Sequence, residues 1–404
     1  MYQRFLSIVI CALLTVQTAL AQTRIAVMSD SHVSSKTTSA GERKMLDKSR
    51  VIFDRLIRQF KIQKPNLLLV TGDLTETGDI ENHQYVKAGL DQLKAVGVKV
   101  FVIPGNHDFG TLDEEGFRMM YADYGYGAAS VKDSTSLSYA CEPMKGLTLI
   151  GIDSHSGYLS ETTLNWVCQQ AEEARNKGRQ VIAMMHHPLF PHFNNADLFI
   201  STSTIGNYEN VRNKLADAGI KVILTGHFHT SDIAKDWNED LSREIYDINT
   251  GSAVSYPCDY RMLTLSRDLK ELTVTTKHID TLPGEANFAK TAKERLYASM
   301  YNLAYQKIAS RGSFGDNEKK QLADIAARAF IVHAEGNEAS HAEVVGQINS
   351  DLNRLGSGGN FLIKTVITYL KPTIESVLTD TSNLGDPERE NRTDDLTLSI
   401  KLAD

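Results

Sequence analysis

Short apolar runs rich in valine, isoleucine and leucine recur along the first half of the chain, and most of them end at a polar motif. Because the runs are continuously apolar rather than alternating, they predict strands that are buried on both faces of a sheet. The expected strands are Arg24–Ser29, Leu67–Thr71, Val98–Ile103, Leu147–Ile152, Gln180–Met185 and Ile220–Thr225. Stretches with helical spacing lie between them, at Lys48–Lys61, Glu81–Ala95, Thr163–Lys177 and Tyr208–Ala218. This alternation predicts a layered α/β domain.

The pattern changes in the second half of the chain. Strand-like runs with short turns, expected to complete a second sheet, occupy Ile245–Asn249, Arg261–Ser266 and Glu271–Lys277. Beyond a break at Thr281–Gly284, helical spacing returns over Asn287–Ala309, Asn317–Ala334, His341–Arg354 and Phe361–Leu378. We therefore predict an α/β domain over residues 22–284 and a helical domain over residues 285–404. In the second of these, Leu396–Leu402 could add one late strand or dock onto a core.

The N-terminus has the pattern of an export signal. Arg4 precedes an apolar run over Phe5–Val16, and Ala19-Leu20-Ala21 is a small-x-small cleavage sequence. We expect residues 1–21 to be a cleaved signal peptide and the protein to be secreted or periplasmic. An uncleaved anchor is the alternative, but the apolar run is short for a span of about 20 residues. We expect no membrane span after cleavage.

Net charge limits the possible partners, and the cysteine content limits the number of disulfides. The formal net charge of −7 argues against a polymeric nucleic acid as partner, although small phosphates stay compatible with it. If Cys11 leaves with the signal, the mature chain keeps Cys141, Cys168 and Cys258. At most one internal disulfide can form among them, and three buried free thiols are an equal alternative.

Five polar motifs supply oxygen and imidazole groups in the order in which the predicted strands end. They are Asp30-x-His32, Gly72-Asp73, Gly105-Asn106-His107-Asp108, His186 and Gly226-His227-Phe228-His229. In layered α/β domains such residues converge beyond the carboxyl ends of the strands. Two adjacent cations need an anionic bridge, for which Asp73 is the candidate. The mixture of oxygen and nitrogen ligands suits Mn, Fe, Zn or Co better than Ca.

In this order, the motifs resemble the pattern of the calcineurin-like metallophosphoesterase superfamily, which reads DxH, GD, GNH[E/D], H and GHxH. The resemblance covers Arg24–Ile279 and is strongest to the bacterial class III cyclic-nucleotide phosphodiesterases. It implies a layered two-sheet sandwich (α/β-β/α) followed by a C-terminal helical domain. It also implies site roles for individual residues. The first metal would be held by Asp30, His32, Asp73 and His229, and the second by Asp73, Asn106, His186 and His227.

The resemblance further implies that His107 lies beside the substrate phosphate, oriented by Asp108, and acts as a general acid. Two metals about 3.5 to 4 Å apart can lower the pKa of a shared water, which supplies a hydroxide for in-line attack on phosphorus. The predicted function is a phosphodiesterase acting on cyclic nucleotides or related small phosphodiesters. A broad phosphomonoesterase or nucleotidase is the alternative, and a non-catalytic scaffold of the same fold is a further one.

Several other residues allow two interpretations, one functional and one structural. His155, Phe109 and His192 could contact the substrate, or they could pack within ordinary loops. His83 is expected on a solvated helix face. Glu76 stands where purple acid phosphatases place a tyrosine, which argues against that branch. The helical domain could be a lid, a homodimer contact or a partner surface.

Overall fold

The structure is a computed structural model, which describes residues 22–36, 42–194, 203–310, 315–358, 361–379 and 394–402. The expected signal peptide lies outside the described residues, so its prediction stays untested. The same holds for Asn195 in the loop after His192 and for most of the polar tail after Thr379. Within the described residues, no helix combines the length and apolarity needed to cross a membrane.

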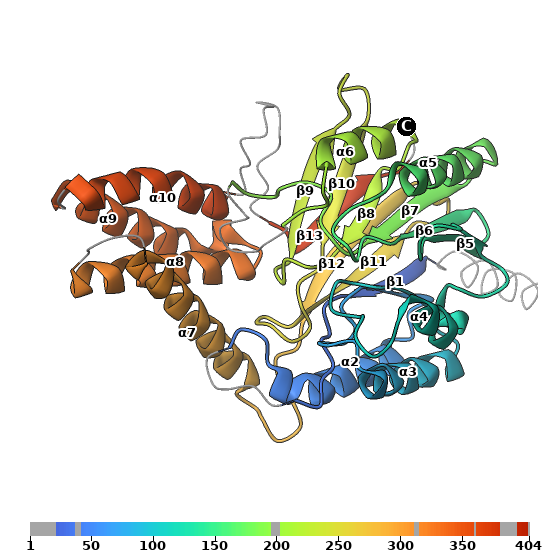
Figure 1. Ribbon diagram of the computed structural model, residues 1–404, viewed down its shortest axis with the longest axis horizontal. Coiled ribbons are helices and arrows are strands. Elements are labelled where there is room, and N and C mark those ends of the chain that lie inside the picture. The colour runs from blue at the N-terminus through green and yellow to red at the C-terminus, as the bar shows by residue number, and fades with distance from the viewer. Residues whose placement is uncertain are drawn as a thin grey trace, which may run out of the picture.

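Two mixed sheets form the larger part of the molecule (Figure 1). The first sheet has six strands in the order β13 (Thr397–Lys401), β12 (Glu271–His278), β11 (Asp259–Leu265), β1 (Thr23–Met28), β2 (Leu67–Thr71) and β3 (Lys99–Ile103). The second has seven, in the order β4 (Val131–Lys132), β5 (Tyr139–Met144), β6 (Leu147–Ile152), β7 (Gln180–Met185), β8 (Val222–Thr225), β10 (Glu244–Asn249) and β9 (Asp232–Trp237).

All six strands predicted in the first half of the chain are confirmed, with ends within two residues of the expected ones. Strands β1, β2 and β3 are parallel to one another, as are β6, β7 and β8. Their carboxyl ends therefore meet along one edge of the two sheets.

The prediction that the later strands complete a second sheet is only partly right. Strand β10 does join the second sheet, where it pairs in parallel with β8. Strands β11 and β12 instead extend the first sheet, because β11 pairs antiparallel with β1 and covers an edge that would otherwise be open. The late strand considered near the C-terminus is β13, which pairs with β12.

Helices cover the outer faces of both sheets, and the inner faces share a core. Helices α2 (Ser49–Gln63) and α3 (Ile80–Ala95) pack on the first sheet, with the short α4 (Glu114–Met120) nearby. Helices α5 (Glu161–Asn176) and α6 (Tyr208–Asp217) pack on the second. Between the sheets, Leu69 of β2, Leu149 of β6 and Met184 of β7 belong to one buried cluster. This is the layered α/β sandwich that the sequence predicts.

The four helices predicted beyond Gly284 are also present. They are α7 (Phe288–Ala309), α8 (Asp316–Ala334), α9 (Ala342–Gly358) and α10 (Phe361–Thr379), with a 3₁₀ turn at Glu338–His341. They form a helical region beside the sandwich (Figure 1). The division of the chain at residue 284 stays a prediction, since β13 returns to the first sheet. Cys141, Cys168 and Cys258 are all free, as the alternative of three free thiols predicts, but only Cys258 is buried.

Candidate metal centre

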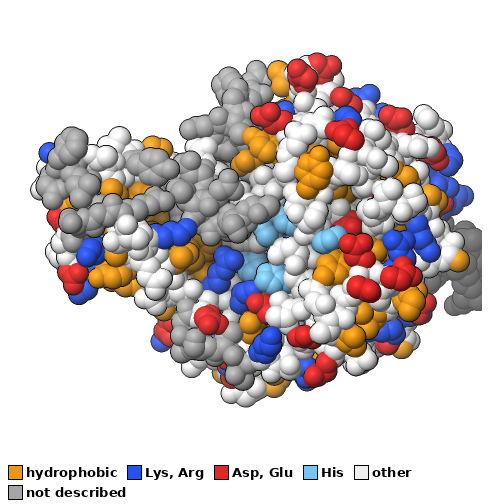
Figure 2. All heavy atoms as spheres, in the orientation of Figure 1, with side chains coloured by type: hydrophobic (Ala, Val, Ile, Leu, Met, Phe, Trp, Pro, Cys, Tyr) orange, Lys and Arg blue, Asp and Glu red, His pale blue; other side chains and the backbone are white. Residues whose placement is uncertain are grey.

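The five polar motifs come together at the carboxyl ends of the parallel strands. Three of the loops follow β1, β2 and β3 in the first sheet, and two follow β7 and β8 in the second. In Figure 2, histidine side chains line a hollow on the face of the molecule, with lysine or arginine side chains beside them. The sequence prediction that these residues converge on one rim is therefore confirmed.

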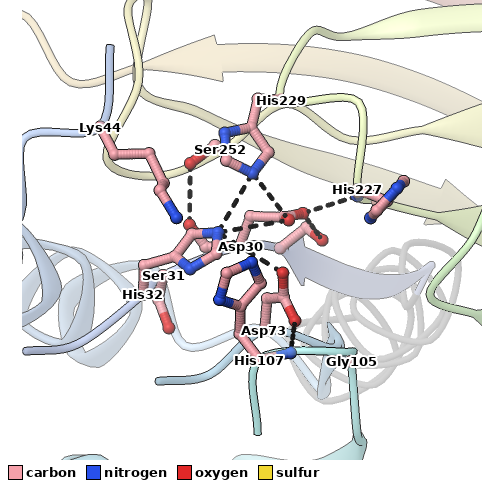
Figure 3. Close-up of polar contacts among 12 residues, drawn as sticks. Asp30, Ser31, His32, Lys44, Asp73, Gly105, His107, His227, His229 and Ser252 are labelled. Atoms are coloured by element: carbon pink, nitrogen blue, oxygen red, sulfur yellow. Dashed lines mark hydrogen bonds and ion pairs between the residues drawn. The ribbon is translucent and has the colours of Figure 1, made fainter. Parts of the chain in front are cut away.

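Four residues form what we call the first half-site: Asp30, His32, Asp73 and His229. The Nε2 atoms of His32 and His229 lie 3.1 Å apart, and His229 Nε2 lies 3.2 Å from Asp30 Oδ1. His32 Nε2 is also 3.5 Å from Asp73 Oδ2. All four side chains are buried, and one atom from each lies within 4.8 Å of the others. Figure 3 shows these side chains pointing toward one another.

The second half-site consists of Asp73, Asn106, His186 and His227. His186 Nε2 lies 3.4 Å from Asp73 Oδ2 and 3.1 Å from Asn106 Oδ1. His227 Nδ1 is likewise 3.1 Å from Asn106 Oδ1. The same oxygen of Asp73 therefore faces both half-sites, which is the placement that a bridging carboxylate requires.

Glycines in the motifs allow the loops to approach the ligands closely. A Cβ atom on Gly105 would lie 2.2 Å from Asp73 Oδ1, and one on Gly226 would lie 2.6 Å from Asp30 Oδ2. Any larger residue at either position would displace a carboxylate of the site.

The backbone at the ligands is itself strained. Five of them have positive φ angles, namely Asp30 at 50°, His32 at 38°, Asp73 at 49°, His227 at 71° and His229 at 66°. Residues other than glycine occupy this region at a cost of about 1–3 kcal/mol each, and they do so mainly at functional sites.

Hydrogen bonds behind the ligands fix which atoms face the centre. His32 Nδ1 lies 2.8 Å from Glu76 Oε2, and His186 Nδ1 donates to the carbonyl of Thr71 at 2.8 Å. Both imidazoles therefore direct Nε2 inward. The other oxygen of Asp73 accepts from the His107 amide at 2.8 Å, which turns Oδ2 toward the two half-sites.

The charges of the site favour metal binding. Burial opposes the charge on Asp73, but the imidazoles of His186 and His32 outweigh it and hold the pKa of the carboxyl below its ordinary value. Burial lowers the pKa of His227 to about 4 and that of His229 to about 3, which favours the neutral form that binds metal. For His186, burial is outweighed by the carboxylate of Asp73, which raises the pKa to about 9. A metal ion would therefore displace a proton from His186.

The predicted role of Asp108 as a partner of His107 is wrong. Asp108 is buried and accepts hydrogen bonds from the amides of Leu74, Thr75 and Gly105 at 2.9–3.1 Å. It joins the loop that carries Asp73 to the loop that carries Asn106. The imidazole of His107 is instead oriented by Glu76, whose backbone carbonyl lies 2.8 Å from His107 Nδ1.

Glu76 has a structural role that its motif did not predict, and His83 is buried rather than solvated. The Glu76 carboxylate pairs with Lys44 Nζ at 2.6–2.7 Å as well as with His32, and these cations outweigh burial and lower its pKa to about 2. His83 is not solvated but fully buried, where it contacts the Tyr121 hydroxyl and the Asp108 carbonyl at 2.9 Å. The spacing of Glu76 after Gly72-Asp73 was the available signal for its role.

The three residues considered as substrate contacts have different environments in the structure. Phe109 and His155 are half-buried and in edge contact, with ring centres 4.6 Å apart, so both stay candidates. His192 cannot form an open wall, because its side chain is fully buried between Asp232 and Asp247, each at 3.1 Å. Burial is outweighed by these two carboxylates, which raise the pKa of His192 to about 10.

The helical region supports the loop that carries His227 and His229. Between these two ligands, the buried Phe228 packs with Phe193 and with Val377 of α10. Two further contacts tie α8 and α10 to the loops around the site: Asn194 N donates to Ser376 Oγ at 2.8 Å, and His333 lies 3.8 Å from Asp232. The helical region is thus part of the structure that holds the metal ligands.

The donor set fits a pair of transition-metal ions. Two buried carboxylates, four imidazoles and one amide oxygen converge in two groups that share Asp73. This mixture of ligands is typical of Mn, Fe and Zn sites rather than of calcium sites. The structure therefore contains a dinuclear metal-binding site.

Comparison with known proteins agrees with this geometry. The family model of calcineurin-like phosphoesterases matches residues 23–231. A probable glycerophosphodiester phosphodiesterase from Arcobacter nitrofigilis is 26% identical over 213 residues, which cover 50% of this chain and 70% of the relative. A probable cyclic nucleotide phosphodiesterase from Synechococcus sp. is 27% identical over 188 residues, which cover 44% of this chain and 64% of the relative.

Among solved structures, a dimetal phosphatase from Danio rerio is similar, with a TM-score of 0.49 and 13% sequence identity, over 63% of this chain and 96% of that protein. The family match covers more than half of the chain and includes every loop of the dinuclear site. This chain belongs to the calcineurin-like phosphoesterase family, and it is a metal-dependent phosphoric ester hydrolase.

Proposed function

We propose that this enzyme is a phosphodiesterase for small substrates, with cyclic nucleotides as the leading class. The observation that carries the proposal is the pair of half-sites sharing Asp73 Oδ2, next to the half-exposed imidazole of His107. The preference for diesters is supported by the names of the two relatives, which are phosphodiesterases for glycerophosphodiesters and for cyclic nucleotides.

The ligand roles in the proposal follow the two half-sites. Asp30, His32, Asp73 and His229 would hold one ion, and Asp73, Asn106, His186 and His227 the other, with Mn, Fe or Zn as candidates. When bound, such a pair of ions lowers the pKa of a water molecule and polarises the phosphoryl oxygens.

His107 would act as the general acid of the reaction. Its Nδ1 donates to the Glu76 carbonyl and stays occupied throughout. In the protonated imidazole, Nε2 carries the second proton and can donate it to the leaving alkoxide oxygen. After the transfer His107 is neutral and keeps its proton on Nδ1. This type of catalysis typically contributes about 10²–10⁴ in rate.

The proposal extends to the place of action, which would be outside the cytoplasm. Its support is the charged start, the apolar run Phe5–Val16 and the small-residue cleavage sequence ending at Ala21. Appearance of a shortened chain in a periplasmic or extracellular fraction would test this.

The function itself is tested with four substrates: bis(p-nitrophenyl) phosphate, p-nitrophenyl phosphate, and 2′,3′- and 3′,5′-cyclic AMP. Protein lacking residues 1–21 is loaded with Mn²⁺, and the variant Asp73→Ala is measured in parallel. We expect turnover of the aryl diester and of at least one cyclic nucleotide, abolished in the variant. Turnover of the monoester alone would make the enzyme a phosphatase, and no turnover of any substrate would favour the scaffold alternative.

A further inference from the structure

Two half-buried rings, those of Phe109 and His155, come from loops that border the metal centre. Phe109 lies in the loop after β3, close behind the ligand Asn106 and the proposed acid His107. In this loop Asn106 is exposed, and His107 and Phe109 are half-buried, whereas Asp108 between them is buried. The accessible side of a loop that carries a metal ligand therefore also carries the Phe109 ring.

His155 reaches the same border from the second sheet. Strand β6 pairs in parallel with β7, which ends at the residue before the ligand His186. Just beyond β6, Ser154 Oγ accepts a hydrogen bond from the His186 amide at 3.2 Å. His155 is the next residue, and its ring centre lies 4.6 Å from that of Phe109. Backbone and ring contacts thus place both rings beside the second half-site.

Both rings are held from behind. Phe109 packs against the buried Phe117, with the ring centres 5.8 Å apart. His155 Nδ1 lies 2.7 Å from Asp153 Oδ1, and the other oxygen of this buried carboxylate accepts from the Leu137 amide at 3.0 Å. A ligand that binds against these rings therefore loses little free energy to their ordering.

The open side of the centre is the side that carries the two rings. In the first half-site, the side chains of Asp30, His32 and His229 are at most 7% exposed, so the organic part of a bound phosphoester has no room there. In the second half-site Asn106 is exposed. The organic part of a phosphoester bound by both half-sites would therefore extend over the border that carries Phe109.

The two rings offer an apolar surface and one polar edge. With Nδ1 of His155 facing Asp153, the other ring nitrogen Nε2 lies 3.7 Å from Glu114 Oε1, which is too far for a hydrogen bond. A planar ring with polar atoms at its rim, such as a nucleobase, matches both features. It can pack on Phe109 and form a hydrogen bond with His155 Nε2. A short aliphatic substituent such as glycerol offers no such ring.

We infer that Phe109 and His155 form a wall that binds a planar ring on the organic part of the substrate and thereby determines specificity. The inference rests on the proposed phosphodiesterase function and narrows its substrates. Diesters that carry a ring, such as nucleotides, are favoured over small aliphatic diesters such as glycerophosphodiesters. Asp153 is a positioning residue, which acts through His155.

The test uses three singly charged substrates with the same p-nitrophenolate leaving group: methyl p-nitrophenyl phosphate, p-nitrophenyl phenyl phosphate and thymidine 5′-(p-nitrophenyl phosphate). The first has no second ring, the second has an apolar ring, and the third has a nucleobase. Phe109→Ala should lower the ratio of kcat/KM for either ring-bearing ester to that for the methyl ester by about 10-fold, mainly through KM. Phe109→Leu keeps apolar bulk without a flat ring and should give an intermediate loss.

His155→Gln should lower the ratio for the thymidine ester by about 3-fold and the ratio for the phenyl ester less, because only thymine has polar atoms for Nε2. Turnover of the methyl ester reports in every variant whether the centre is still folded. Unchanged ratios in Phe109→Ala, equal losses on all three substrates, or a full ratio in Phe109→Leu would overturn the inference. An unchanged thymidine ratio in His155→Gln would overturn the paired wall.

The matched controls are Trp237→Leu and His278→Gln, which should leave all ratios unchanged. Trp237 is a half-buried aromatic residue that pairs with the first residue of β10, so it lies at the edge of the second sheet opposite the ligands. His278 Nδ1 lies 2.5 Å from Asp259 Oδ1, an arrangement like that of His155, but three strands separate β12 from β3.

A binding measurement separates this inference from the proposed function. Calorimetry with the Mn²⁺-loaded protein compares phenylphosphonate with methylphosphonate, whose C–P bonds resist phosphoester hydrolysis. The natural protein should bind phenylphosphonate more tightly, and Phe109→Ala should weaken its binding about 10-fold while affecting methylphosphonate little. This result would support the inference even if none of the esters were hydrolysed. Hydrolysis with unchanged ratios and unchanged binding preference would refute it and leave the function standing.

Discussion

The two half-sites share Asp73 but differ in their contact with solvent. In the first, the side chains of Asp30, His32 and His229 are at most 7% exposed. In the second, His186 is buried, but His227 is half-buried and Asn106 is exposed. The first half-site also has a second layer of support from Glu76 and Lys44. We therefore predict that an ion in the first half-site exchanges more slowly than one in the second, which is more open to solvent and to a substrate.

Removing the shared ligand tests whether the two half-sites form one unit. Asp73→Ala should lower turnover by about 10³-fold or more and reduce the metal content of both half-sites, because no other described carboxylate faces both. Elemental analysis together with turnover of the aryl diester measures this. Asp123→Ala is the control, since Asp123 is exposed and, among the described residues, forms its ion pair with Lys94 at the surface. Full metal content in Asp73→Ala would contradict the shared-ligand arrangement.

His107 belongs to neither ligand set. Its substitution therefore distinguishes a role in the reaction from a role in metal binding. His107→Ala should lower turnover by about 10²–10⁴-fold while the protein keeps both ions. Turnover and metal content are measured on the same preparation. Loss of metal from this variant would mean that His107 is a ligand and not a general acid.

The support behind the first half-site should matter for affinity. Glu76→Gln keeps the shape but removes the carboxylate that orients His32, so the affinity for one of the two ions should fall about 10- to 100-fold. Competition with a chelator measures the two affinities. Glu81→Gln is the matched control, because Glu81 pairs with Arg50 on the surface of α3. Equal weakening of both ions would contradict the separate support of the first half-site.

The smallest expected effect concerns His192, in the loop that follows β7 and carries the ligand His186. His192, buried between Asp232 and Asp247, has its pKa raised to about 10 from the ordinary 6.5. Its pairing therefore stabilises the fold fully below about pH 6.5, and this contribution is lost as the pH rises toward 10. The difference in Tm between the natural protein and His192→Gln should therefore shrink by a few degrees from pH 7 to pH 10. A Tm difference that does not change with pH would disprove the charged state of His192.

The order of the motifs was enough to predict the sheets and the convergence of the ligands, because each motif ends a continuously apolar run. Side-chain partners in the layer behind the ligands were not predictable in the same way. Asp108 follows His107 in sequence, yet it turns to the backbone of the neighbouring loop. His83 is surrounded by polar residues along its helix, but the fold places it against Tyr121.

Long-range pairing explains the remaining differences. Strand β11 joins the first sheet because of β1, which lies more than 200 residues earlier in the chain. The burial of His192 depends on Asp232 and Asp247, which arrive from later strands. In both cases the deciding partner is distant in sequence, so local spacing carries no signal of it.

The left-handed backbone at five ligands means that this enzyme gives up stability for activity at the residues that define it. A glycine in place of such a ligand relieves the strain at that position while removing a metal donor. Screens that select for thermal tolerance in metal-free conditions would therefore enrich inactive chains. A heat-resistant variant of this protein should be checked for catalysis before it is counted as an improvement.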